Sequence, residues 1–470
     1  MSETTTDTIA LPSVDATITA IATPPGPGGI GIIRISGSQS LRILTEIFSP
    51  ATPPASFLSH RLCYGWIKNP RTGRIIDEVL AVFMRAPRTY TREDVVEIHC
   101  HGSFLVLQEI LALIINLGAV AAQPGEFTKR AFLNGRIDLT QAEAVIDLLQ
   151  AKTNEGLGIA MAQLQGRMGD LVSGIRSSLI NLRAIIEVAI DFPDDDVEII
   201  RAEAMGRQVE DEIIAPLRTL IQSAGQGKIF RDGISVIILG QPNVGKSSLL
   251  NALLKEERAI VTAVPGTTRD TIEEFLDIKG IPVRIVDTAG IRDNAEEVEE
   301  IGIERARRKL AQADVVLLLV DGTQPPQPAD IKLYESIGSK KRLLLINKTD
   351  IAAPAGSLFR QAFPDTAPIQ ISAKTHAGID DLEDGLFQLV TGTAHWDPGH
   401  SCIPNVRHRT SLEKALNACE NVKNGLTTAL PADLLAIELQ TALDHLGDII
   451  GETTTEDILD VIFEQFCIGK

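Results

Sequence analysis

Residues 240–247 read Gly-Gln-Pro-Asn-Val-Gly-Lys-Ser, a segment that fits the phosphate-binding pattern G-x-x-x-x-G-K-S/T. It follows an almost wholly apolar run at 234–239, which is typical of a parallel strand buried on both faces. It precedes a leucine-rich segment at 248–255 that predicts a helix. A strand, a glycine loop and a helix in this order direct backbone N–H groups and a helix N-terminus at phosphate oxygens. The segment therefore predicts an α/β nucleotide-binding domain.

Further motifs follow in a fixed order: Gly266-Thr267-Thr268, Asp287-Thr288-Ala289-Gly290, Asn347-Lys348-Thr349-Asp350 and Ser372-Ala373-Lys374. The Asp350 carboxylate can accept hydrogen bonds from guanine N1–H and from the 2-amino group. Adenine offers neither donor and would leave a buried carboxylate unpaired. We expect the aliphatic stem of Lys348 to lie against the base, and a backbone N–H of the 372–374 segment to reach guanine O6. The ordered set predicts a GTPase.

The phosphate and magnesium contacts follow from the same motifs. We expect Lys246 to reach the β- and γ-phosphates and the Ser247 hydroxyl to bind Mg²⁺. Thr268 is expected to add its hydroxyl to Mg²⁺ only when GTP is bound, as in the usual GTPase switch. Asp287 would hold the Mg²⁺ shell directly or through water, and Gly290 would offer its N–H to the γ-phosphate. The residues predicted to contact GTP are Asn243, Val244, Gly245, Lys246, Ser247, Ser248, Thr262, Ala263, Val264, Pro265, Gly266, Thr267, Thr268, Asp287, Thr288, Ala289, Gly290, Asn347, Lys348, Asp350, Ser372, Ala373 and Lys374.

The group that activates water is not the usual one. Many small GTPases carry a glutamine directly after this Asp-x-x-Gly motif to orient the attacking water. Here the position is Ile291, which cannot do so. The acidic run at 296–300 is close enough in sequence to supply another group. The same run is also typical of a solvated helix start that complements the helix dipole, and the sequence leaves both interpretations open.

Length and composition limit the remaining possibilities. For 470 residues we expect about three domains. The net charge of −18 gives the chain as a whole no electrostatic footprint of a nucleic-acid-binding protein. The five cysteines include no C-x-x-C pair and favour reduced thiols. The most apolar stretch, 105–122, is interrupted by polar residues and predicts a core helix rather than a membrane span. We therefore expect a cytoplasmic protein without a signal peptide.

Helical patterns flank the nucleotide-binding region. Residues 139–191 and 406–466 have few helix breakers and repeat apolar residues at helical spacing. They predict one helical domain interrupted by an insertion, with the chain crossing between domains at the Gly/Pro-rich stretches 224–233 and 392–404. Short strands with Gly/Pro loops before them predict a separate N-terminal domain. The predicted domains are residues 1–123, helical part 124–230, nucleotide-binding 231–392 and helical part 393–470.

Other segments carry a family resemblance. They are Ala-Thr-Pro-Pro-Gly at 22–26, Arg-Ile-Ser-Gly at 34–37, Pro-Gly-Glu-Phe-Thr at 124–128, Phe-Leu-Asn-Gly-Arg-Ile-Asp-Leu at 132–139 and Cys-Ile-Gly-Lys at 467–470. With the GTPase motifs, they resemble the MnmE (TrmE) family of tRNA modification GTPases over essentially the whole chain. The resemblance implies a homodimer with an N-terminal α+β tetrahydrofolate-binding domain and a discontinuous helical domain. Into the latter is inserted a P-loop GTPase domain with a doubly wound, mostly parallel sheet.

The resemblance also implies an activity. Such proteins work with the flavin-dependent partner MnmG, in a heterotetramer or larger complex. They build an aminomethyl or carboxymethylaminomethyl group on C5 of the wobble uridine of certain tRNAs. The one-carbon unit comes from a 5-formyl- or 5,10-methylene-tetrahydrofolate. The implied folate contacts are Arg34, Glu97, Arg136 and Lys470; the family also carries lysine at the place of Arg136.

The resemblance further implies K⁺ at the GTPase site, held by Asn243, Thr262, Val264 and Thr267. The implied water-positioning acid is Glu299. A cation that bridges the phosphates would stabilise the same developing charge as an arginine finger, and no such finger is evident in this sequence.

Other interpretations remain open at the sequence level. A GTPase switch in ribosome assembly or translation, with no chemistry beyond hydrolysis, would carry the same nucleotide motifs. Such proteins usually have a basic RNA-binding appendage, which we do not find in this sequence. Cys467 has the chemistry of a nucleophile, but it also fits as a small apolar residue near a helix end. Saturable binding of 5-formyl-tetrahydrofolate would favour tRNA modification over the switch.

Overall fold

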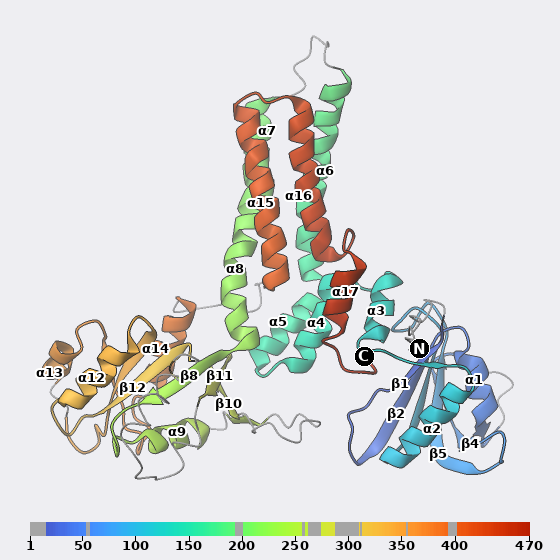
Figure 1. The fold of residues 1–470 in the computed structure, drawn as a ribbon, viewed down its shortest axis with the longest axis horizontal. Helices are drawn as coiled ribbons and strands as arrows, with labels where there is room; N and C mark the ends of the chain where they lie inside the picture. The colour runs from blue at the N-terminus through green and yellow to red at the C-terminus, as the bar shows by residue number, and fades with distance from the viewer. Residues whose placement is uncertain are drawn as a thin grey trace, which may run out of the picture. The chain divides into compact units, whose positions relative to one another are not determined.

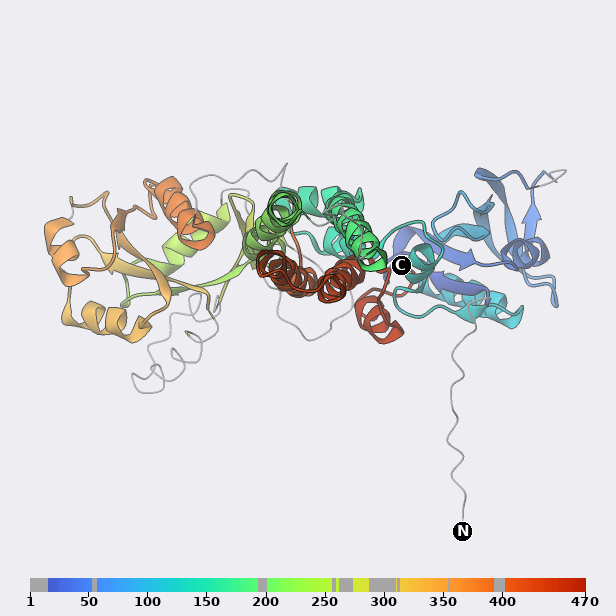
Figure 2. The same cartoon turned by 90° about the horizontal axis from the view of Figure 1, so that it is seen from above.

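A computed structural model describes residues 16–52, 57–192, 201–255, 259–261, 274–286, 310, 313–353, 356–392 and 402–470. These residues form two compact units (Figures 1 and 2). The first unit contains residues up to 146 together with 447–470, and the second contains the described residues between 147 and 446. No helix in the described ranges combines the length and the apolar composition that crossing a membrane requires.

The first unit is built on a sheet with the strand order β3-β4-β5-β6-β2-β1-β7, antiparallel except for the pairing of β1 with β7. Its strands are β1 Ile18–Ile21, β2 Gly28–Ser36, β3 Phe48–Pro50, β4 Arg61–Lys68, β5 Ile75–Met84, β6 Val95–Gly102 and β7 Val120–Ala121. The helices α1 (Ser40–Ile47) and α2 (Phe104–Asn116) contribute to its hydrophobic core. Ile33 and Ile35 of β2 are buried in that core. Because side chains alternate along a strand, Arg34 between them points to the opposite face.

The predicted core helix over 105–122 is shorter than expected. Helix α2 ends at Asn116, and the chain then forms β7, which pairs with β1. Gly118 has a φ of 104°, a conformation open to glycine and rarely adopted by other residues. The apolar pattern continued through the turn because the short strand beyond it is also apolar, so periodicity alone could not locate the helix end.

The C-terminal segment belongs to the first unit. Helices α3 (Glu126–Leu133), α4 (Leu139–Gln150) and α17 (Glu456–Phe463) share a small apolar core that includes Leu139, Phe463 and Phe466. Beyond α17, Ile468 forms an isolated antiparallel bridge with Pro124. The last residues of the chain therefore lie against the segment that enters α3.

The second unit contains the predicted nucleotide-binding sheet. Its strands are β8 Ile234–Leu239, β9 Ala259–Val261, β10 Glu274–Ile278, β11 Ile281–Ile285, β12 Val315–Asp321, β13 Lys341–Asn347 and β14 Pro368–Gln370. The order is β14-β13-β12-β8-β11-β10-β9; β10 is antiparallel to both of its neighbours, β11 and β9, and all other pairs are parallel. Strand β8 lies between β11 and β12, so the order of the strands reverses at β8. In open α/β sheets, ligands bind at the carboxyl ends of the strands beside such a reversal.

Both faces of this sheet are covered by helices. Val236 and Ile238 pack with leucines of α9 (Lys246–Lys255) and α14 (Ile379–Thr391). Ile237, on the other face, packs in a core that includes α12 (Pro328–Ile337) and α13 (Gly356–Ala362). The apolar run therefore reflects burial on both sides, and the predicted doubly wound, mostly parallel sheet is confirmed.

The remaining helices form a bundle that belongs to the second unit as far as Leu446. They are α5 Asn154–Leu164, α6 Arg167–Asp191, α7 Ala202–Val209, the π-helical turn Glu210–Ile214, α8 Ala215–Asp232, α15 Val406–Thr427 and α16 Ala432–Ile450. Helix α15 packs against α7 and α8 (Figure 1), and Figure 2 shows the bundle end-on. Helices that precede and follow the sheet in sequence thus lie together, as predicted for a helical domain interrupted by an insertion.

The chain passes from α8 to β8 at the last residue of the predicted crossing 224–233, and the rest of that stretch is helical. The stretch 224–233 is not a loop, because α8 continues to Asp232. Gly227 lies inside the helix, where a Cβ atom would come within 1.5 Å of Ile403 Cγ2. This glycine permits close packing rather than breaking the helix. The chain leaves α8 at Gly233, whose φ is 78°. Most of the other predicted crossing, 392–404, lies outside the described residues.

Candidate functional site

The loop at 240–247 joins the end of β8 to the start of α9. A Cβ atom on Gly240 would lie 2.4 Å from the Leu319 carbonyl oxygen of β12, and one on Gly245 would lie 2.3 Å from Asn347 Nδ2. Gly245 also has a φ of 102°, and Asn243 has a φ of 61°. The glycines of the motif are therefore required by contacts on both sides of the loop.

Asn347 holds the loop against the base-recognition segments. It is the last residue of β13 and is 3% exposed. Its Nδ2 donates to the Val244 carbonyl at 2.8 Å, and its Oδ1 accepts from the Ala373 backbone N–H at 3.0 Å. One side chain thus satisfies buried backbone groups on two loops. The sequence predicted Asn347 as a GTP contact; the described contacts make it a brace between the loops.

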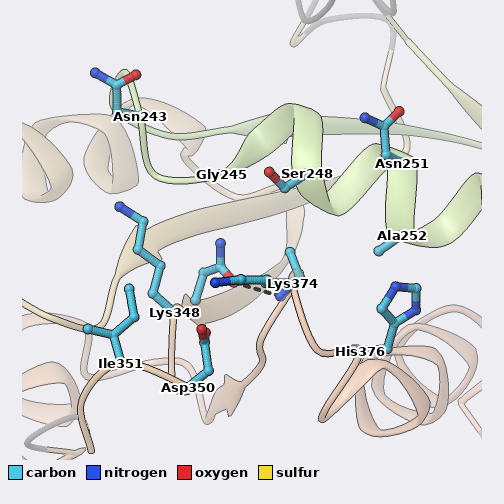
Figure 3. A pocket seen from close by; sticks show the side chains of 12 residues that line it. Asn243, Gly245, Ser248, Asn251, Ala252, Lys348, Asp350, Ile351, Lys374 and His376 are labelled. Atoms are coloured by element: carbon cyan, nitrogen blue, oxygen red, sulfur yellow. Dashed lines mark hydrogen bonds between the residues drawn. The ribbon is translucent and has the colours of Figure 1, made fainter.

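A cavity of about 450 Å³ opens between these loops (Figure 3). It is lined by Asn243, Gly245, Ser248, Asn251, Ala252, Asn347, Lys348, Asp350, Ile351, Ala373, Lys374 and His376. Ser372 Oγ donates to Asp350 Oδ1 at 2.8 Å, and this bond orients the exposed carboxylate. A cavity of this size is typical of small-molecule sites. The structure therefore brings together the base-recognition residues that the sequence predicted.

Oxygen atoms of the protein hold the side chains of two lysines in the nucleotide motifs. Lys246 Nζ donates to the Gly240 and Gln241 carbonyl oxygens, both at 2.9 Å, and burial lowers the pKa of this ammonium. Lys348 has a φ of 66°, and its Nζ lies 2.7 Å from Asp321 Oδ2. Asp321 belongs to none of the sequence motifs that predict the nucleotide site. The sequence pattern could have predicted it, because Asp321 is a charged residue directly after an apolar strand, at the edge of the sheet where ligands bind.

Several predicted site residues lie outside the described residues. They are Thr262, Ala263, Val264, Pro265, Gly266, Thr267, Thr268, Asp287, Thr288, Ala289, Gly290 and Glu299. Of the residues predicted for Mg²⁺, Ser247 is described; it lies in the first turn of α9 and is exposed. Of those predicted for K⁺, Asn243 is described, and its side chain lines the cavity.

A second polar cluster lies in the first unit. Arg34 and Glu97 are register partners on β2 and β6, and Arg34 Nε donates to Glu97 Oε1 at 2.8 Å. The Arg34 guanidinium lies 5.6 Å from the centre of the Phe127 ring. The Arg136 guanidinium lies 4.7 Å from the centre of the Tyr90 ring and donates to the Tyr90 carbonyl oxygen at 3.1 Å. The sequence could not predict Tyr90 as a site residue, because a single aromatic residue in a loop fits no motif.

The chain terminus completes this cluster. Arg34 Nη1 donates to the Gly469 carbonyl oxygen at 3.3 Å, and the Lys470 carbonyl oxygen accepts from the Phe127 backbone N–H at 3.2 Å. Gly469 has a φ of 95°, and a Cβ atom there would lie 2.5 Å from the Ile21 carbonyl oxygen. Cys467 is exposed. The residues implied for folate, although far apart in sequence, therefore lie in one neighbourhood.

Comparisons with known proteins show the family to which the chain belongs. Residues 17–136 match a family model described as the GTP-binding protein TrmE N-terminus, and residues 139–467 match one described as the MnmE helical domain. The chain is 52% identical over 460 residues to the tRNA modification GTPase MnmE of Desulfotalea psychrophila, covering 97% of this chain and 98% of that one. The chain belongs to the MnmE family of tRNA modification GTPases.

Other MnmE family relatives match over the same length. The tRNA modification GTPase MnmE of Carboxydothermus hydrogenoformans is 45% identical, covering 97% of this chain and all of that one. Among solved structures, Aquifex aeolicus Era bound to GDP and AlF4⁻ is 27% identical and covers 39% of this chain and 66% of that one, with a TM-score of 0.27. Family membership confirms the resemblance found in the sequence and makes this chain a GTP-hydrolysing enzyme of tRNA modification.

Proposed function

We propose that the chain hydrolyses GTP in order to modify C5 of the wobble uridine of certain tRNAs, together with the flavin-dependent partner MnmG. The product would carry an aminomethyl or carboxymethylaminomethyl group. A 5-formyl- or 5,10-methylene-tetrahydrofolate would supply the one-carbon unit. The relatives' shared name, tRNA modification GTPase, supports the tRNA substrate. The clustering of Arg34, Glu97 and the chain terminus is the observation that carries the folate role.

In the proposed nucleotide site, Asp350 selects guanine and Lys246 binds the β- and γ-phosphates. Ser247 offers a hydroxyl oxygen at the start of α9, which suits Mg²⁺, an ion that prefers oxygen ligands. We assign Thr268 to the same ion. The remaining predicted GTP contacts, including those outside the described residues, keep the roles given to them from the sequence.

We propose K⁺ as a second cation, with the Asn243 side chain, Thr262, Val264 and Thr267 as its ligands. The Asn243 side chain is exposed in the cavity lining and offers an amide oxygen, a suitable donor for an alkali cation. K⁺ would supply positive charge against the charge that develops on the phosphates. Glu299 would orient the attacking water, because Ile291 cannot.

In the proposed folate site, Arg34, Glu97, Arg136 and Lys470 contact the cofactor. The Glu97 carboxylate can accept from ring and amino N–H groups, while the cationic side chains suit the carboxylates of the folate tail. Arg34 and Glu97 are paired with side-chain exposures of 20% and 19%, so ligand groups can still reach them. Cys467 is exposed near this cluster, and a chemical role for its thiol remains a proposal.

We further propose a cytoplasmic homodimer with domains at 1–123, 124–230, 231–392 and 393–470. All five cysteines are unpaired, which suits a reducing compartment. With a net charge of −18, the chain is poorly suited to neutralise many phosphates. We therefore propose that MnmG holds much of the tRNA, while this chain contributes folate and GTP hydrolysis.

Equilibrium dialysis with 5-formyl-tetrahydrofolate tests the proposal. We expect the parent protein to bind saturably and Arg34→Ala to bind at least about tenfold more weakly, because charged hydrogen bonds are lost. Arg42→Ala is the matched control: Arg42 lies on α1 and pairs with Glu46, and its loss should leave binding unchanged. Absence of saturable binding by the parent would favour a GTPase switch without folate chemistry.

A further inference from the structure

The end of β12 carries a carboxylate that is fixed by its own chain. Asp321 is the last residue of β12 and the register partner of Asn347 on β13. Asp321 Oδ1 accepts from the Thr323 backbone N–H at 2.9 Å and from the Thr323 hydroxyl at 2.6 Å. The Gly322 N–H donates to the Asn347 carbonyl oxygen at 2.8 Å. The carboxylate is therefore oriented by a turn that is attached to the neighbouring strand.

The second oxygen of this carboxylate faces the base lysine. Asp321 Oδ2 lies 2.7 Å from Lys348 Nζ, and the side chains are 21% and 29% exposed. Burial alone would raise the pKa of Asp321, but hydrogen bonds from Lys348 and Thr323 outweigh it and leave the pKa lowered. Asp321 is therefore ionised at neutral pH, and the pair is charge-assisted.

Lys348 is a residue for which such an anchor matters. Its backbone has a φ of 66°, a conformation that is uncommon for residues other than glycine. The lysine side chain has many rotamers, and ordering them on ligand binding costs affinity. An anchor at the ammonium end orders the hydrocarbon stem in advance.

We propose that Asp321 is a positioning residue for guanine recognition: it holds the Lys348 ammonium so that the lysine stem already lines the base cavity. The inference rests on the proposed guanine site around Asp350. Asp321 is not among the residues that line the base cavity. It acts through Lys348, and its effect should therefore be the same for GDP and GTP, which share the base.

A purely structural role for Asp321 makes a different prediction. In that case the carboxylate would only stabilise the turn through Thr323. Asp321→Asn separates the two roles, because the amide oxygen can still accept from Thr323 while the charge that holds Lys348 is lost.

The experiment is a double-mutant cycle on GDP affinity, measured by calorimetry for the parent, Asp321→Asn, Lys348→Met and the double variant. We expect Asp321→Asn to weaken GDP binding about three- to tenfold, because the lysine is no longer ordered in advance. The double variant should bind no more weakly than Lys348→Met alone. In steady-state hydrolysis the loss should appear in KM for GTP more than in kcat.

Asp384→Asn is the matched control, because it breaks the surface ion pair with Lys279 in the same unit and should leave GDP affinity unchanged. Additive effects of Asp321→Asn and Lys348→Met, or unchanged affinity in Asp321→Asn, would overturn the proposal. Failure of the guanine site itself would show separately, as Asp350→Asn retaining parental GDP affinity.

Discussion

At the scale of single residues, the Asn347 amide joins the phosphate loop to the base-recognition segment. Asn347→Ala would leave the Val244 carbonyl and the Ala373 N–H without their partner. We expect the free energy of unfolding of the nucleotide-binding sheet to fall by about 1 to 3 kcal/mol for each unsatisfied group. Urea denaturation with GDP titration measures both effects, and GDP affinity should also fall.

Asn251→Ala serves as the control for this prediction, because Asn251 lines the same cavity from an exposed position on α9. Its stability should remain close to that of the parent. Equal stability of Asn347→Ala and the parent would show that the amide does not brace the loops.

Residue types and their order were enough to predict the nucleotide site, because each motif is short and fixes its own chemistry. Pairings between distant residues could not be predicted in this way. Asp321 and Lys348 are 27 positions apart, and they meet only because β12 and β13 are parallel in a particular register. Arg34 and Gly469 are 435 positions apart, and here a family resemblance supplied what local pattern could not.

At the scale of elements, two glycines in α8 have opposite roles. A methyl group added at Gly225 would have no atom within 4 Å apart from its chain neighbours and the backbone of its own helix, whereas one added at Gly227 would lie 1.5 Å from Ile403 Cγ2. We expect Gly225→Ala to stabilise the protein by about 0.5 to 1 kcal/mol, since alanine favours the helix. Gly227→Ala should destabilise it by about 1 to 3 kcal/mol through overpacking.

Thermal unfolding of the two variants, which differ by two positions in one helix, measures the contrast. Equal shifts would contradict the packing of Ile403 on α8. The pair also explains why most of the glycine-rich stretch 224–233 is helical: a sequence does not distinguish a glycine that breaks a helix from one that admits a neighbouring side chain.

The turn between β10 and β11 is attached to the start of α5. Thr153 Oγ1 donates to the Gly280 carbonyl oxygen at 2.8 Å and accepts from the Gly156 N–H at 3.1 Å as the helix N-cap. Thr153→Val loses both bonds, and we expect about 1 to 3 kcal/mol of stability to be lost. Thr153→Ser keeps the hydroxyl and should recover most of it in urea denaturation. If Thr153→Val unfolds at the same urea concentration as the parent, the two hydrogen bonds of Thr153 contribute nothing to stability.

At the scale of the whole molecule, residues 467–470 belong to the first unit, whereas the described GTPase motifs belong to the second. Removal of residues 467–470 would delete the bridge between Ile468 and Pro124 and the acceptor for Arg34 at Gly469. We expect 5-formyl-tetrahydrofolate binding to be lost while GTP hydrolysis continues. Dialysis and phosphate release, measured on the same preparation, test this separation. Loss of both activities in a folded protein would contradict it.

The proposed function depends most on guanine recognition at the carboxyl edge of the second sheet. Asp350→Asn replaces an acceptor for guanine N1–H and the 2-amino group with an amide, which instead suits the 2-oxo group of xanthine. The measurement is steady-state hydrolysis of GTP and of xanthosine triphosphate by the parent and by Asp350→Asn. We predict that the parent prefers GTP, and that Asp350→Asn loses at least about a hundredfold in kcat/KM for GTP while it gains hydrolysis of xanthosine triphosphate. Parental kcat/KM for GTP in Asp350→Asn would contradict guanine recognition by Asp350.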